Sequence, residues 1–488
     1  MLVLLLGAAA QAGPSWDSIV RLTTNPAHQY TGYGRQRSIA LDRAGNVHVG
    51  WLDERTTPHQ IWYRRYDAAQ GAWLPEMAVT DRPVNCRLPS LAADSSGNLH
   101  LAWHVESWPD YGIWYKRRDA LSQTWSPDTL IDSGSGTRFK LYPSVAAAGN
   151  RVHVAWSGHP DTGMFYQAFH KEFRPDSGWM ETEMITAAPG MHEQVSVAAD
   201  RNGDVLVAWC GKDFGDPFTQ VYCRRRVGGA WCEVELVSDM ASSFAQFSPS
   251  AAAGADGFHV AWHGSSGTDV YRRVYHRLRR ADAWTDIKTV TGQSERQQEY
   301  ASAAVLPNGE CHLLWAGQTG ASNVTQLWHA QRSPTGHWAA PQKLTSRTSN
   351  VRHPAIAAGS DTTAHVAWHD ETSGNNDVYY LRGRAALVGL SGPERGPLRS
   401  SLRVFPNPCA AGVVTLRLEA RDKGVEGQRD RVASLRLFDA AGRCVLEQPI
   451  ADRQSPIALG LRGLRGGVYF IRVDKAGQTQ SAKLIIKE

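Results

Sequence analysis

Cysteine and methionine are both scarce in this sequence, with seven of each among 488 residues. Seven cysteines are too few to form a disulfide scaffold in a chain of this length. The fold must therefore depend on a hydrophobic core.

A transmembrane segment is also missing. The apolar run from Leu2 to Ala10 is too short to span a bilayer. Ala10, Gln11 and Ala12 follow as a small-residue cleavage pattern, although no Lys or Arg comes after Met1. We therefore interpret residues 1–12 as a signal peptide with an irregular start.

The chain has little net charge of either sign. It contains 52 basic and 47 acidic residues, which are interspersed and give a formal charge of +5. A nucleic-acid partner is not expected from this distribution. An anionic glycan is compatible with it, and no cofactor is predicted.

A repeat that ends in tryptophan fills most of the sequence. Each copy resembles SAAAGADGFHVAW, which runs from Ser250 to Trp262, and successive copies are 52 or 53 residues apart. A fixed period of this size indicates a repeat architecture. The seven copies end at Trp51, Trp103, Trp156, Trp209, Trp262, Trp315 and Trp368.

Each repeat reads as four β-strands. An apolar run and a polar turn precede an alternating run such as Val47 to Trp51, and a third strand rich in aromatic residues and arginine follows. A tight turn then leads to a second tryptophan. Four antiparallel strands in about fifty residues are typical of a propeller blade. The second series comprises Trp73, Trp125, Trp179, Trp231, Trp284 and Trp338.

The seventh repeat lacks a second tryptophan, but Trp16 stands before the first repeat. We predict that the strand from Trp16 to Thr23 forms the outermost strand of the last blade. The expected fold is all-β, a seven-bladed β-propeller over residues 13–384. The fourteen tryptophans of the two series are expected to form its core.

A histidine stands three residues before the anchor tryptophan in six of the seven repeats. Leu206 replaces it in the fourth, so packing or hydrogen bonding between strands is favoured over a ring of ligands. The six are His48, His100, His153, His259, His312 and His365.

Three cysteines fall together in the fourth repeat. Cys210, Cys223 and Cys232 could form a local disulfide or a metal site, but the nearest histidines lie outside the cluster, so no metal site is predicted. Cys409 and Cys444 could pair in an oxidising compartment.

The carboxy-terminal part follows a different pattern. Residues 385–401 read as a linker rich in Gly, Pro and Ser, and residues 402–488 contain short alternating strands broken by turns, as in a small immunoglobulin-like β-sandwich. Phrases such as LRVFPNP, LRLFDAAGRCV and LRGLRGGVYFIRV resemble the C-terminal sorting domain of type IX secretion. The resemblance implies passage through the periplasm, recognition by the type IX machinery, and secretion or display at the outer cell surface.

The repeats also resemble bacterial sialidase-like propellers of the BNR or Asp-box type. Ser38 to Trp73 is the closest copy, but the Asp-box survives only in eroded form, as in SPTGHW from Ser333, and an R-I-P motif is absent. Known sialidases have six blades rather than seven. Catalytic residues therefore cannot be transferred by position.

Antiparallel order brings the start of each first strand and the exit of each second strand to one mouth of the central channel. Three arginines near this mouth offer planar forks of donors for a carboxylate or sulfate. Trp108 belongs to neither tryptophan series and is expected to offer a face for a sugar ring. The predicted ligand-binding residues are Arg35, Arg87, Arg352, Asp53, Trp108, Glu193 and Asp370.

Two functions follow from these residues. The first is a secreted or surface-bound monomeric propeller that binds an extracellular glycan or other anionic ligand. The alternative is a sialidase-type glycoside hydrolase in which the arginines hold the substrate carboxylate, Asp53 is the acid, and Tyr300 with Glu299 forms the nucleophilic pair. No catalytic residue is assigned under the first function.

Overall fold

A computed structural model gives the arrangement of the chain, which divides into two compact units, Met1–Gly389 and Leu390–Glu488. Residues 1–12, most of the predicted linker, Arg35 and Trp108 lie outside the described residues. The structure describes residues 15–32, 37–107, 111–134, 139–160, 163, 165–186, 189–213, 217–238, 244–267, 269–281, 283–292, 296–320, 322–359, 363–384, 400–405, 409–410, 413–420, 433–439, 444–450, 457–461, 464–475 and 478–487.

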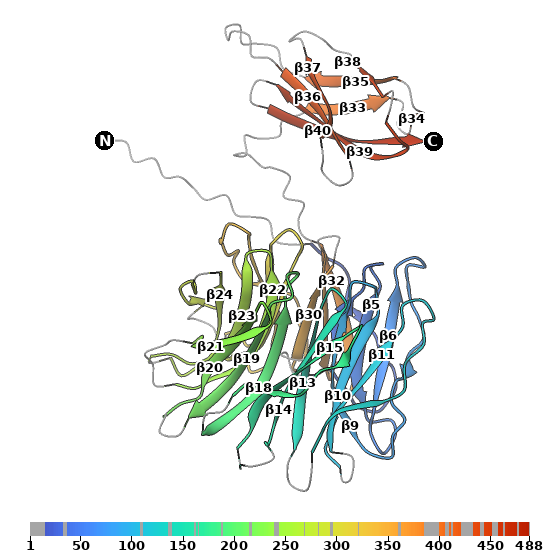
Figure 1. Ribbon diagram of the computed structural model, residues 1–488. Coiled ribbons are helices and arrows are strands. Elements are labelled where there is room, and N and C mark those ends of the chain that lie inside the picture. Colours follow the sequence, from blue (N-terminus) through green and yellow to red (C-terminus); the bar gives the residue numbers. More distant parts are fainter. Residues whose placement is uncertain are drawn as a thin grey trace, which may run out of the picture. The chain divides into compact units, whose positions relative to one another are not determined.

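The described part of the first unit forms seven antiparallel sheets, numbered here as blades 1 to 7 by their anchor tryptophans (Figure 1). Blade 1 contains β3 (Gln29–Tyr30), β4 (Ile39–Leu41), β5 (Val47–Asp53), β6 (Gln60–Asp67), β7 (Ala72–Trp73) and β8 (Met77–Ala78). Blade 2 contains β9 (Cys86–Ala93), β10 (Leu99–Val105), β11 (Gly112–Arg118) and β12 (Thr129–Ser133). Blade 3 contains β13 (Lys140–Ala148), β14 (Arg151–Gly158), β15 (Gln167–Arg174), β16 (Gly178–Trp179) and β17 (Glu183–Met184).

In blades 4 to 7, as in blades 1 to 3, the strands are named from the central channel outwards. Blade 4 contains β18 (Gly190–Ala199), β19 (Val205–Asp213), β20 (Gln220–Val227) and β21 (Ala230–Leu236). Blade 5 contains β22 (Gln246–Gly254), β23 (Gly257–Gly264), β24 (Arg273–Arg279) and β25 (Lys288–Thr289). Blade 6 contains β26 (Gln298–Val305), β27 (Cys311–Gly317), β28 (Gln326–Arg332) and β29 (Gln342–Lys343). Blade 7 contains β30 (Arg352–Ala358), β31 (Thr363–Asp370) and β32 (Asp377–Arg384), together with β1 (Ser15–Trp16) and β2 (Val20–Arg21).

The prediction that the amino-terminal strand completes the last blade is confirmed. β1 and β2 both pair with β32, and Trp16 lies opposite Gly383. The closing contact between blades 7 and 1 is hydrophobic, because Ala355 and Val378 share one buried cluster with Ile39 and Trp51.

Hydrogen bonds explain why a serine begins most repeats. The backbone N–H of Val197 in blade 4 donates to Oγ of Ser144 in blade 3, and the N–H of Ala251 in blade 5 donates to Oγ of Ser196 in blade 4. Each bond joins the innermost strands of neighbouring blades. The same bond is made by Ser90, Ser250 and Ser302.

The anchor tryptophans are core residues as predicted, with at most 1% of each side chain exposed. The second series is only partly buried. Most of its rings instead pack edge-on against a ring of the preceding blade, as Trp179 does on Tyr115 with ring centroids 4.9 Å apart. The second series therefore joins adjacent sheets, since an edge-to-face pair adds stability beyond its buried area.

The recurring histidines bond strands to each other, which agrees with the preferred sequence interpretation. Nδ1 of His48 lies 2.6 Å from the hydroxyl of Tyr63, and Nδ1 of His100 lies 2.7 Å from that of Tyr115. Cys223 and Cys232 carry unpaired thiols, so no disulfide joins these two. Cys444 is likewise unpaired, and the suggested pairing with Cys409 is not formed.

The second unit is a small β domain with two described sheets. One contains β33 (Ser400–Phe405), β35 (Val413–Ala420) and β38 (Ile457–Gly460). The other contains β34 (Cys409–Ala410), β36 (Ala433–Asp439), β37 (Cys444–Ile450), β39 (Gly467–Lys475) and β40 (Gln478–Lys487). Across the described parts of both units, no helix is long and apolar enough to cross a membrane.

Candidate binding face

The mouth face is defined by the starts of the innermost strands, and it carries a ring of strained residues. Non-glycine residues there adopt φ angles between 45° and 58°, each beside a shift in register of the innermost strand. Left-handed conformations cost about 1–3 kcal/mol each and gather at functional sites. The ring comprises Leu88, Tyr142, Gln194, Ser248, Tyr300 and His353.

One group of polar and aromatic side chains lies around Tyr142, over blades 2 and 3. We name it the Tyr142 group: Arg87, His104, Glu106, Tyr142 and Tyr166. Nε2 of His104 lies 3.0 Å from Oε1 of Glu106, and Nε of Arg87 lies 3.5 Å from Oε2 of the same carboxylate. The His104 and Tyr142 rings meet edge to face, with centroids 5.6 Å apart.

Electrostatics link the members of this group. The hydrogen bond from His104 lowers the pKa of Glu106, and the charge of Arg87 adds to this effect. Burial raises the pKa of Tyr166, and the nearby Tyr142, Glu193 and Glu106 raise it further. Glu106 is therefore ionised at neutral pH, while Tyr166 keeps its proton and can donate a hydrogen bond.

A second group of rings crosses the mouth face from blade 5 to blade 1. We name it the Tyr300 group: Tyr30, His263, Tyr300, His353 and His369. Tyr300 contacts His263 at 5.6 Å and His353 at 4.6 Å between centroids. His353 contacts His369 at 5.3 Å, and His369 contacts Tyr30 at 5.4 Å.

His369 is held neutral within this group. Burial, followed by the charge of Arg352, lowers the pKa of His369 to about 3. The backbone N–H of Thr31 donates to Nδ1 at 3.2 Å, which also requires an unprotonated nitrogen. His369 therefore supports the neighbouring rings and adds no positive charge to the mouth near neutral pH.

Two of the three predicted arginines, Arg87 and Arg352, lie at the mouth-face ends of β9 and β30. Arg87 has 38% of its side chain exposed, and Arg352 is exposed at the start of β30. Glu193 is half-buried on β18, the innermost strand of blade 4. The acidic partner expected in the alternative hydrolase is already engaged, because Oε1 of Glu299 accepts a short hydrogen bond from Arg272.

Asp53 and Asp370 do not reach the mouth, which corrects the prediction for both. Each is fully buried. Oδ2 of Asp53 accepts from Nε1 of Trp51 at 3.0 Å, and Arg55 binds both oxygens through Nε at 2.9 Å and Nη2 at 2.7 Å. In blade 7, Nε1 of Trp368 donates to Asp370 at 2.9 Å. Both carboxylates serve the blade interior and are not available to a ligand.

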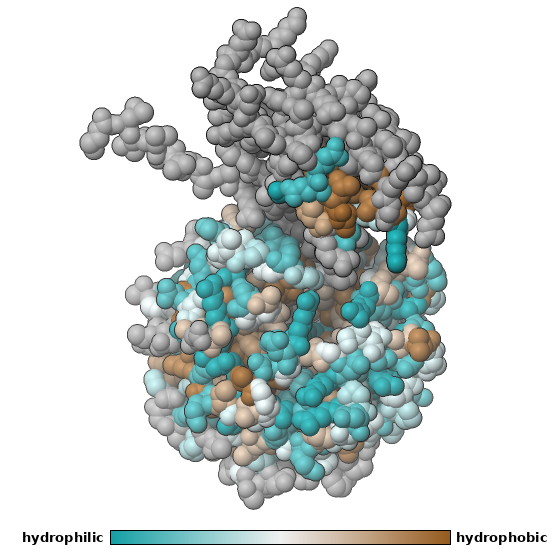
Figure 2. All heavy atoms as spheres, turned by 45° about the horizontal axis from the view of Figure 1, so that its top comes forward, coloured by the Kyte–Doolittle hydropathy of each residue, from teal (hydrophilic) through white to brown (hydrophobic). Residues whose placement is uncertain are grey.

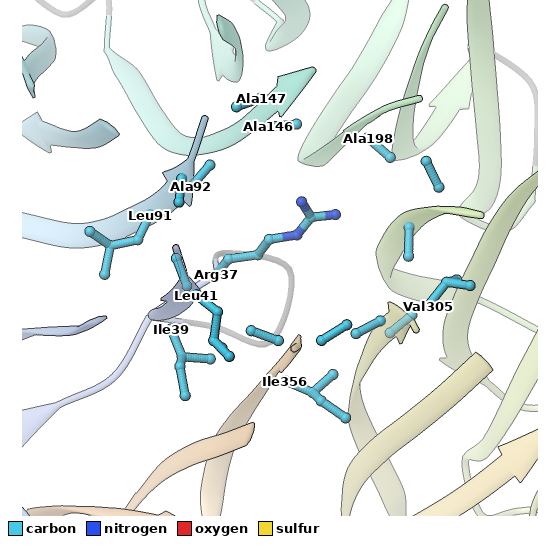
Figure 3. Close-up of a pocket in the computed structure, with 18 of the residues that line it drawn as sticks. Arg37, Ile39, Leu41, Leu91, Ala92, Ala146, Ala147, Ala198, Val305 and Ile356 are labelled. Atoms are coloured by element: carbon cyan, nitrogen blue, oxygen red, sulfur yellow. The ribbon is translucent and has the colours of Figure 1, made fainter. Parts of the chain in front are cut away.

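Sequence reasoning missed Arg37, which enters the central channel. Its side chain reaches into a cavity of about 190 Å³ lined largely by alanines of the innermost strands, and Nη2 donates to the carbonyl of Ala251 at 2.6 Å (Figure 3). Burial lowers its pKa to about 10, so it stays charged at neutral pH. The signal was present, since the other repeats carry Pro, Val or Ala at this position, namely Pro89, Pro143, Val195, Pro249, Ala301 and Pro354.

The rest of the visible propeller surface shows no large apolar patch. In the view of Figure 2 most described side chains are hydrophilic, and hydrophobic ones are scattered. Single exposed hydrophobic residues are normal for a soluble surface. The aromatic residues of the mouth face therefore indicate a candidate binding site better than the scattered hydrophobic side chains do.

Comparison with one known structure supports the fold, and two further similar structures are reported beside it. A polysaccharide lyase of family PL25, an ulvan lyase, shares 13% identity at a TM-score of 0.50, covering 77% of this chain and 100% of that chain. The polysaccharide lyase Uly1 shares 9% identity at a TM-score of 0.49, with 76% and 99% covered. The Trypanosoma rangeli sialidase shares 11% identity at a TM-score of 0.40, with 94% and 89% covered. At such identities the likeness concerns the fold alone.

No curated protein matches the chain. The carboxy-terminal tail, by contrast, matches a known family. Residues 403–487 match the family described as the secretion system C-terminal sorting domain. A seven-bladed β-propeller is thus followed by a type IX secretion C-terminal sorting domain, which indicates secretion or display at the outer surface.

Proposed function

We propose that the secreted propeller binds an anionic polysaccharide at its mouth face. The observation that carries the proposal is the Tyr142 group, in which a half-exposed guanidinium, two tyrosines, a histidine and a carboxylate from adjacent blades meet. These residues lie beside a ring of left-handed backbone.

The charges of this face suit an acidic sugar. Arg87 offers a planar fork that matches a carboxylate or sulfate, and its pairing with Glu106 at 3.5 Å is long and exposed, so it contributes little stability. Arg352 supplies a second exposed guanidinium, and Arg37 places a buried positive charge in the channel. A ligand anion would replace Glu106 as the partner of Arg87.

The aromatic residues provide the apolar part of the site. Tyr142 and Tyr166 are both half-buried, and half-buried tyrosines combine contact area with a polar tip. A sugar ring has the same combination of an apolar face and a polar edge. A uronate-bearing sulfated polysaccharide is a suitable first probe, because the ulvan lyase of similar fold is described as bound to a GlcA–Rha3S unit.

Binding can be tested on the full chain with a uronate-bearing sulfated polysaccharide and a neutral polysaccharide of similar length. We expect binding of the anionic polymer only, weakening with salt. Arg87→Ala should reduce affinity by about tenfold or more, since a hydrogen bond to a charged group contributes about 1.5–3 kcal/mol. Arg201→Ala is the matched control, because this exposed arginine lies on a hairpin turn at the opposite face. Equal loss in both variants, or equal binding of the neutral polymer, would refute the proposal.

A second candidate function, β-elimination, is favoured by the contact between His104 and Tyr142. In a lyase, a base removes the proton beside a uronate carboxylate, a carbon–carbon double bond forms, and the glycosidic oxygen leaves with a proton. Tyr142 could serve as the base and, once protonated, as the acid. His104 is fully buried and can only position Tyr142, and Arg87 would neutralise the carboxylate. Appearance of an unsaturated uronate product, lost in Tyr142→Phe with binding retained, would establish this activity. Absence of product from a bound polymer leaves the propeller as a binding protein.

A further inference from the structure

A separate cluster of metal-ligating side chains lies inside the propeller, between blades 5 and 6. One nitrogen from each of His259 and His276 and the sulfur of Cys311 all lie within 4.8 Å of one another. All three side chains are fully buried or nearly so. We propose that this cluster is a structural zinc site that joins two blades.

The cluster is a departure from the repeat, which makes it informative. In blades 3, 5 and 6 a pair of histidines bridges the second and third strands at 2.9–3.1 Å. In the blade that follows each pair, one repeat position lies four residues before the anchor tryptophan. This position holds Val205 for blade 3 and Ala364 for blade 6, but Cys311 for blade 5. Equivalent positions beside the other two histidine pairs carry hydrophobic side chains, so only the pair in blade 5 has a thiol beside it among these three blades.

The chemistry of the donor set favours zinc. Imidazole nitrogen and thiolate sulfur are usual ligands of Zn²⁺, whereas Ca²⁺ and Mg²⁺ require oxygen ligands, and the three donors would fill three of the four tetrahedral positions of zinc. The two histidine nitrogens are 2.9 Å apart and share one hydrogen bond. A zinc ion would replace that hydrogen bond with two coordinate bonds, after a small separation of the rings.

The surroundings of the cluster supply the support that a bound histidine needs. The other nitrogen of His259, Nε2, lies 2.9 Å from Oδ1 of Asp256, which fixes the ring with Nδ1 turned towards His276. Asp256 is held in turn by Arg332 at 3.1 Å. Carboxylates placed in this way behind a ligating histidine orient it and strengthen metal binding. Trp338 packs edge-on against His276 at 5.0 Å and covers the site.

Metal content of the full chain, produced with zinc and then freed of loosely bound metal, tests the proposal. We expect about one zinc per chain. Cys311→Val and His276→Tyr should each remove most of it, and both substitutions place at the site a residue that equivalent positions of other blades already carry. Cobalt added to the metal-stripped chain should give a thiolate charge-transfer band that Cys311→Val abolishes.

His329→Tyr is the matched control, because it changes the same kind of histidine pair in blade 6, for which the next blade supplies Ala364 in place of a cysteine. It should leave the zinc content unchanged. Asp256→Asn should weaken zinc binding by about 10–100-fold. A wild-type chain that neither carries nor takes up zinc overturns the proposal, as does zinc that survives Cys311→Val in a folded protein. Neither result depends on polysaccharide binding.

Discussion

Closure of the ring can be tested at Thr23. This residue comes from the amino terminus, but it occupies a position in blade 7 that blade 6 fills with its own Thr345. In blade 6, the backbone N–H of Leu327 donates to Oγ1 of Thr345 at 2.9 Å. In blade 7, the N–H of Val378 donates to Oγ1 of Thr23 at the same distance, although the two residues are 355 positions apart. Thr23→Val therefore removes a closing bond, and Thr345→Val removes its local counterpart.

The two hydroxyls differ in the group to which they donate. Oγ1 of Thr23 donates to the buried carboxylate of Asp377 at 2.9 Å, whereas Oγ1 of Thr345 donates to the neutral amide oxygen of Gln326 at 2.9 Å. Each substitution strands a buried N–H, which costs about 1–3 kcal/mol. A hydrogen bond to a charged group is worth about 1 kcal/mol more than a neutral one, so Thr23→Val should be the more destabilising by about that amount.

Urea unfolding of the full chain, followed by tryptophan fluorescence, measures both changes. We expect lower midpoints with an unchanged slope, since neither variant alters the surface exposed on unfolding. In both variants Nη2 of Arg21 still lies 2.8 Å from Oδ2 of Asp377, so the charge of Asp377 stays paired. If Thr23→Val costs less than about half of what Thr345→Val costs, the amino-terminal strand does not close the ring as described.

Three further predictions follow from buried contacts. Ser196→Ala should lower the free energy of unfolding by about 1–3 kcal/mol in urea titrations, because it leaves the N–H of Ala251 without an acceptor between the blades. If this free energy did not change, the serine bonds would not stabilise the packing of the blades. Stability should fall as the pH drops from 7 to 5, because His369 has a folded pKa of about 3 and an unfolded histidine takes up a proton below about 6.5. His369 alone contributes about 2 kcal/mol of this loss at pH 5, and His369→Gln should flatten the profile measured by urea unfolding at both pH values. Gly317→Ala should cost about 1–3 kcal/mol, because its Cβ would overlap the Gln298 amide that accepts from Nε1 of Trp315 at 2.6 Å; an unchanged midpoint in thermal unfolding would show that this amide can move freely.

The repeat allowed the fold to be predicted in detail. The spacing of the anchor tryptophans predicted seven blades, and the missing second tryptophan of the last repeat identified Trp16 as its substitute. Both inferences succeed because local hydrogen bonding and a period of two fix the strands within each unit. The phrases of the tail predicted the sorting domain for the same reason, since they are local patterns.

The candidate site was predicted only in part. Arg87 and Arg352 reach the mouth, but Asp53 and Asp370 do not. Each aspartate lies two residues after an anchor tryptophan, and residues i and i+2 of a strand share one face. Their side chains therefore point into the core with the tryptophan, which the sequence could have indicated.

The sequence by itself determined the number of blades, their strand order, the closing strand and the exported tail, because each is set by contacts within about fifty residues or by a strict period. Only the tertiary structure decided which side chains from different blades meet. The contacts of Arg37 with Ala251, of His104 with Tyr142, and of Cys311 with the blade 5 histidines all cross between sheets. Such contacts depend on how neighbouring sheets are rotated and offset, and a repeat period carries no information about that offset.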